Sequence, residues 1–99
     1  MEIEIHRYDY QKVEDFADAY GLKMVVRERG ANHHPNARFY ASFEGIEVKY
    51  GCILSGPCGN GATPEEAIEN YLPEISKRML VHNAYGDDRR VFTAPILVM

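Results

Sequence analysis

The sequence predicts a small α+β domain, with two helices packed on one face of an antiparallel sheet in the order β-α-β-β-β-α-β. Several short stretches alternate apolar and polar residues, as half-buried strands do. Two other stretches, residues 9–21 and 63–79, repeat apolar residues at helical spacing. The 99 residues are 45% hydrophobic and 26% charged, which suits one domain spanning residues 1–99.

The chain is expected to begin with a short edge strand and a helix. In residues 2–6, isoleucines alternate with polar residues, which predicts the strand. Asp9 is a suitable N-cap for the helix, and Gly21 is a suitable stop. The apolar face of this helix consists of Val13, Phe16, Ala17 and Tyr20.

Alternation then predicts three strands, over residues 22–28, 37–43 and 46–53. A polar loop, residues 30–36, separates the first strand from the second. The short turn Glu44-Gly45 predicts that the second and third strands pair as a hairpin.

A glycine-rich turn at residues 56–62 is expected to lead into the second helix. Thr63 is a favoured N-cap, Pro64 suits the first helical position, and Glu66 completes a capping box. Pro73 predicts a kink or a division of this helix, because proline lacks the backbone hydrogen-bond donor. The predicted apolar face consists of Ala67, Ile68, Tyr71, Leu72, Ile75 and Met79. We expect residues 80–84 to leave the helix, residues 86–88 to turn, and residues 90–93 to form the last strand.

Composition narrows the classes of function. The net charge of −4 does not favour an electrostatic hold on nucleic acid. The longest apolar runs fall far short of the roughly 20 residues that cross a bilayer, and the first residues lack the pattern of a signal peptide. We therefore expect a cytoplasmic protein whose two cysteines, Cys52 and Cys58, are reduced thiols.

Acidic residues gather on the two predicted helices. The candidate partner-binding residues are Glu14, Asp15, Asp18, Glu65, Glu66 and Glu69. Because opposite charges attract, they predict a protein partner with a basic surface. The alternative is that these are solvated helix faces without a partner. An open face of the sheet can also hold a second copy of the chain, so a homodimer is a further alternative.

The sequence carries no pattern that favours catalysis or metal binding. Cys58 with His33, His34 or His82 supplies the residue types for nucleophilic catalysis, but no nucleophile elbow or cofactor fingerprint accompanies them. The spacing of Cys52 and Cys58 with these histidines matches no familiar zinc knuckle. The glycine-rich turn lacks the lysine of a phosphate-binding loop. We expect no enzymatic activity, no cofactor and no metal.

The predicted order of helix, three-stranded meander and helix resembles the double-stranded RNA binding domain, through residues 16–22, 30–36 and 59–67. In that family, lysines at the start of the last helix contact RNA phosphates, so the resemblance implies RNA binding. Here Glu65 and Glu66 occupy those positions and would repel phosphate. An RNA-binding alternative therefore depends on the loop and its neighbours, namely Arg27, Arg29, His33, His34 and Arg38.

Two further resemblances bear on function. The turn and helix start at residues 61–67 resemble HicB-like antitoxins. The whole chain is similar to small accessory proteins of tailed bacteriophages, through residues 59–67, residues 80–84 and the pair Arg89-Arg90. The phage resemblance implies a protein that acts in the host cytoplasm and inhibits a host enzyme or defence factor. We therefore expect a non-enzymatic accessory protein that binds another protein.

Overall fold

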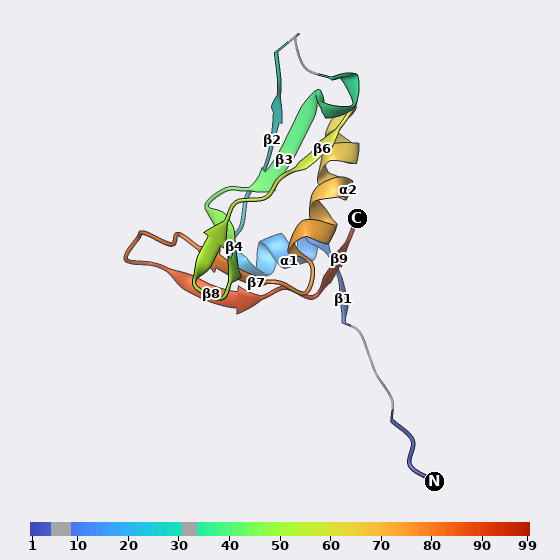
Figure 1. Ribbon diagram of the computed structural model, residues 1–99, viewed down its shortest axis with the longest axis vertical. Coiled ribbons are helices and arrows are strands. Elements are labelled where there is room, and N and C mark those ends of the chain that lie inside the picture. Colours follow the sequence, from blue (N-terminus) through green and yellow to red (C-terminus); the bar gives the residue numbers. More distant parts are fainter. Residues whose placement is uncertain (5–8, 31–33) are drawn as a thin grey trace.

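The computed structural model describes residues 1–4, 9–30 and 34–99, which form two α-helices and nine short strands and confirm the α+β class (Figure 1). The elements are β1 (Tyr10–Lys12), α1 (Val13–Tyr20), β2 (Met24–Glu28), the 3₁₀ helix η1 (Pro35–Ala37), β3 (Phe39–Phe43), β4 (Ile46–Tyr50), β5 (Ile53–Ser55), β6 (Gly59–Gly61), α2 (Pro64–Ile75), β7 (Met79–His82), β8 (Arg90–Thr93) and β9 (Ile96–Val98).

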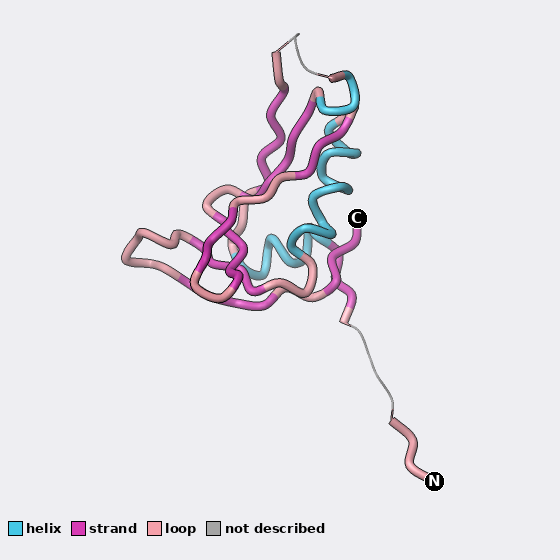
Figure 2. Tube along the Cα trace, in the orientation of Figure 1, coloured by secondary structure: helices cyan, strands magenta, loops and turns pink. Residues whose placement is uncertain are grey.

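The strands of the described residues form three sheets where one was expected. One antiparallel sheet has the order β2-β3-β6, and a second has the order β5-β4-β7-β8. The short strands β1 and β9 pair in parallel. Figure 2 shows the two larger sheets as separate groups of strands, with α2 running along the β2-β3-β6 sheet. The expected single sheet is therefore wrong, although most of its strands exist.

The predicted hairpin across Glu44-Gly45 is wrong. Strand β3 pairs with β2 and β6, whereas β4 pairs with β5 and β7. Gly45 has a φ of 74°, and its carbonyl oxygen accepts a hydrogen bond of 3.0 Å from the backbone N–H of Asn83. The left-handed conformation open to glycine thus turns the chain out of one sheet and into the other. Strand β4 also ends at Tyr50, where a tight turn leads into β5.

Residues 59–61 form strand β6, which corrects the prediction of a glycine-rich turn over the whole of residues 56–62. Gly59 and Gly61 are buried where β6 meets α2. A Cβ atom on Gly61 would lie 2.5 Å from the backbone nitrogen of Ala67 in α2. These glycines therefore allow the backbone of α2 to pack directly against β6, and such a close approach is a common reason for glycine within a strand.

The start of α2 confirms its prediction, but its end does not. The Thr63 side-chain oxygen accepts a hydrogen bond of 3.1 Å from the backbone N–H of Glu66, and Pro64 is the first helical residue. The helix continues through Pro73 to Ile75 without dividing. Met79 lies outside it, in β7, which is a central strand between β4 and β8. The expectation that residues 80–84 simply leave the helix is therefore wrong.

The start of the chain differs most from its prediction. Helix α1 begins at Val13 and has Lys12 as its N-cap, so Asp9 does not cap it. Its end at Tyr20, with Gly21 at a φ of 66°, is as predicted. Residues 1–4 form no strand and Ile3 is 73% exposed, while Ile5 and His6 of the predicted strand lie outside the described residues.

Near the end of the chain, β8 confirms the last predicted strand, and residues 86–88 lie in the turn before it. Strand β9 follows and was not predicted, because Pro95 suggested that the sheet had ended.

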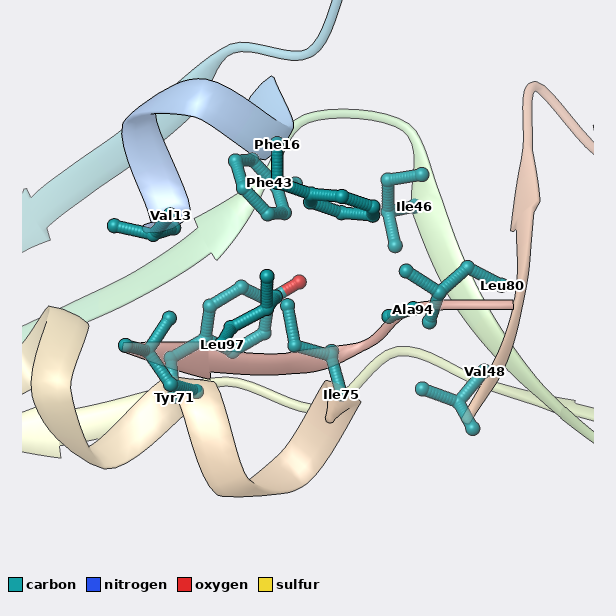
Figure 3. Packing of buried hydrophobic residues seen from close by; sticks show 11 residues of the cluster. Val13, Phe16, Phe43, Ile46, Val48, Tyr71, Ile75, Leu80, Ala94 and Leu97 are labelled. Atoms are coloured by element: carbon teal, nitrogen blue, oxygen red, sulfur yellow. The ribbon is translucent and has the colours of Figure 1, made fainter. Parts of the chain in front are cut away.

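One hydrophobic cluster positions both helices. Figure 3 shows α1 on one side of this cluster and α2 on the other, with Phe43, Leu97 and Tyr71 among the side chains between them. Phe16 of α1 is fully buried, and its ring centroid lies 6.2 Å from that of Phe43 and 6.0 Å from that of Phe92. Phe43 in turn lies 5.8 Å from Tyr71 of α2. Because these rings come from α1, β3, β8 and α2, the cluster ties the two larger sheets together.

Candidate interaction surfaces

All six acidic residues predicted to bind a partner are exposed on the two helices. With Glu74, the helices carry seven carboxylates and no lysine or arginine. Each helix buries its apolar side, Val13 and Phe16 in α1 and four residues in α2, so the carboxylates are left on the solvent side.

A groove lies between the two helices, at the edge of the hydrophobic cluster. Its volume is about 400 Å³. Glu14 and Asp18, one helical turn apart on α1, form the charged part of its lining. The apolar part of the lining consists of Val13, Ala17, Met24, Phe43, Ile68 and Met99. We call this feature the α1–α2 groove.

The structure divides the six acidic residues into two groups. Glu14 and Asp18 meet at the α1–α2 groove, whereas Asp15 and the three residues of α2 do not line it. Within the described residues, neither Glu14 nor Asp18 forms an ion pair. Two unneutralised carboxylates beside an apolar wall produce a stronger negative potential than they would on an open surface. Sequence spacing identifies both carboxylates but not the groove, whose lining comes from α1, β2, β3, α2 and the last residue, Met99.

The arginines proposed for RNA binding are mostly engaged within the fold. Arg38 forms an ion pair with Glu28, with 2.7 Å between Nη2 and Oε1. Arg29 donates a hydrogen bond of 2.9 Å to the carbonyl oxygen of Ala37 and another to the side chain of Asn60. His34 is exposed and accepts a bond from a neighbouring backbone N–H, and His33 lies outside the described residues.

A small basic and aromatic surface nevertheless exists on the β2-β3-β6 sheet. Arg27 is paired in register with Tyr40, and Arg29 follows the last residue of β2. The guanidinium of Arg29 sits 4.4 Å from the centroid of the Tyr40 ring. Because side chains alternate along a strand, Arg27 and Tyr40 lie on one face of this sheet, and Met24, Ala41 and Gly59 lie on the opposite face, toward α2.

The sequence did not identify one buried polar group, the hydroxyl of Tyr71. Tyr71 is fully buried, and this hydroxyl has no hydrogen-bond partner among the described residues. Burial raises the pKa of Tyr71 to about 12, and Cys58 adds to the rise. The backbone of Phe43 opposes it in part, although without the distance and angle of a hydrogen bond. The side chain lies inside the core and is not among the residues that line the α1–α2 groove, so we interpret it as a structural residue.

The described part of the chain shows neither a group of metal ligands nor a helix that could cross a membrane. In residues 1–4, 9–30 and 34–99, no three histidine, cysteine or acidic side chains are grouped as a metal ion requires. Cys52 is exposed and Cys58 half-buried, and both are free thiols. Neither described helix has the length and apolar character needed to cross a bilayer.

Comparisons of the chain with protein-family models, with curated proteins and with solved structures find no match. A proposal about function therefore depends on the surfaces described above.

Proposed function

We propose that this chain is a small non-enzymatic accessory protein of the phage type, which binds a basic surface of another protein through its two helices. The observation that carries this proposal is the separation of charge. The helices hold seven carboxylates and no cation, although the whole chain contains 11 lysines and arginines. A host nucleic-acid-binding protein or defence factor has the kind of basic groove that such a surface complements.

Like charges on the same helix repel one another in both helices. Glu14 and Asp18 stand at positions i and i+4, as do Glu65 and Glu69. Like charges at this spacing destabilise a helix by about 0.2–0.5 kcal/mol a pair. Solvated helices usually mix the two signs and gain a similar amount instead. A partner that places lysine or arginine between these carboxylates would replace repulsion with attraction, and its approach would be accelerated by the negative field.

Affinity capture from a bacterial lysate tests the proposal. The reversed variant carries Glu65→Lys, Glu66→Lys and Glu69→Lys, and the control carries Glu2→Lys, Glu44→Lys and Asp87→Lys, exposed positions outside the helices. Both change the net charge equally. We expect the wild type and the control to capture the same partners and the reversed variant to lose them. Equal capture by all three proteins would mean that α2 is not part of an acidic binding surface.

Nucleic-acid binding is the second candidate, and the surface of Arg27, Arg29 and Tyr40 is the observation in its favour. Arginine and an aromatic ring are the side chains that hold phosphate and bases. A titration of the protein with duplex and single-stranded RNA at several salt concentrations tests it. Absence of binding even at low salt, where phosphate contacts are strongest, removes this candidate.

A further inference from the structure

We infer that the α1–α2 groove receives an apolar side chain of the partner, and that lysine or arginine flanks this side chain. The inference deepens the proposed function and rests on it, because it assigns the chemistry of the partner segment that contacts α1.

The groove has the composition of a site for an apolar side chain. Of the eight described residues that line it, six are apolar, and three of these, Ala17, Met24 and Ile68, are partly buried hydrophobic residues packed against the core. Its volume of about 400 Å³ falls in the range of sites that bind small organic groups. Burial of a leucine or phenylalanine side chain there would remove apolar surface of both molecules from water.

The charged residues at the groove determine which apolar segments of a partner can bind there. Among the described residues that line the groove, Glu14 and Asp18 have the only charged side chains, and neither has an ion-pair partner in this part of the chain. A segment with cations beside its apolar residue can pair with both carboxylates while the apolar residue enters the groove. An acidic peptide, an anionic lipid or a nucleic acid would instead meet repulsion. Complementarity therefore favours a basic segment of a protein over these other occupants.

A selection from a library of short random peptides tests the inference without knowledge of the partner. We expect the peptides enriched on the wild-type protein to share a Leu, Ile, Met or Phe residue close to Lys or Arg. Replacement of that apolar residue by serine in the best peptide should weaken binding by about tenfold, the loss expected for one buried side chain. Binding should also shift the methyl resonances of Ile68 and Met24.

Two variants with the same change in net charge test whether the peptide binds in the groove. The groove variant carries Glu14→Lys and Asp18→Lys, and the control carries Glu2→Lys and Asp87→Lys, which are exposed, lie outside the two helices and do not line the groove. Both raise the net charge by the same amount. We expect the groove variant to bind the best peptide at least about tenfold more weakly and the control within about threefold of the wild type.

Three other outcomes overturn the inference, and a fourth bears on the proposed function instead. If the serine peptide binds as tightly as its parent and both variants weaken binding equally, charge alone holds the peptide, and only the proposed function survives. If the enriched peptides are acidic or purely apolar, the assigned chemistry is wrong. If the protein forms a dimer in light scattering that Glu14→Lys with Asp18→Lys abolishes, a second copy fills the groove. Binding in the groove together with unchanged lysate capture by the reversed α2 variant would count against the proposed function alone.

Discussion

A Cβ atom on Gly59 would lie 2.2 Å from the carbonyl oxygen of Ala67 and 2.2 Å from the backbone nitrogen of Tyr71. Strand β6 and helix α2 thus meet backbone to backbone, with no side chain between them. This contact places α2 against the sheet, and with it Ile68 in the α1–α2 groove and Glu65, Glu66 and Glu69 on the surface. The whole acidic surface of α2 therefore depends on one glycine strand.

Gly59→Ala should accordingly destabilise the protein strongly. The added methyl group overlaps helix backbone, which cannot move aside as a flexible side chain can, so we expect a loss of about 3 kcal/mol or more in the free energy of unfolding. Gly56→Ala is the control, because a Cβ atom there meets nothing within 4 Å. Urea denaturation of both variants checks this. Similar stabilities would show that α2 is not held against β6 in this way.

Tyr71→Phe should stabilise the protein. The Tyr71 hydroxyl is buried without a hydrogen-bond partner in the described structure, and such a group costs roughly 1–3 kcal/mol. Its removal leaves the ring in place, so we expect a gain of about 1 kcal/mol and a higher melting temperature. Calorimetry measures both. A clear loss of stability would reveal that the hydroxyl has a bonding partner after all.

The same residue makes stability depend on alkaline pH. The phenol of the unfolded chain loses its proton near its ordinary pKa of 10.0, whereas burial raises the folded value to about 12. Between these values the unfolded state binds fewer protons, so the free energy of unfolding falls as pH rises, whereas well below pH 10 it does not depend on the ionisation of Tyr71. The fall reaches roughly 2–3 kcal/mol, and Tyr71→Phe should lack it. Urea denaturation of both proteins from pH 9 to 11.5 checks the difference, and parallel curves would contradict it.

Ser76 connects the end of α2 to β9. Its hydroxyl donates a hydrogen bond of 2.7 Å to the carbonyl oxygen of Leu72 and accepts one of 3.0 Å from the backbone N–H of Leu97. Ser76→Ala leaves the N–H of Leu97 without this partner, so we expect a loss of about 2 kcal/mol. Ser55→Ala, at an exposed position of β5, should stay within about 0.5 kcal/mol of the wild type. Hydrogen exchange at the Leu97 amide should accelerate in the first variant and stay slow in the second.

Local signals predicted local structure well. Thr63 and Pro64 predicted the start of α2, and Gly21 predicted the end of α1, because a side-chain cap and a left-handed residue act within one turn of the helix. Asp9 failed as a cap because residues 10–12 pair with β9 instead, an interaction with the far end of the sequence. The groove was not predicted for the same reason: its lining comes from segments that are far apart in the sequence, and local patterns do not show which of them meet.

The sequence by itself determined the α+β class, the positions of β2, β3, β4 and β8, the start of α2 and the acidic character of both helices. These properties follow from periodicity, capping and charge, which each segment carries without reference to its neighbours. Only the tertiary structure decided which strands pair, because alternation in β3 and β4 is satisfied by any strand that covers one face. It also decided the role of Gly59 and Gly61, whose missing side chains serve the approach of α2, and it brought Glu14 and Asp18 to the edge of an apolar groove.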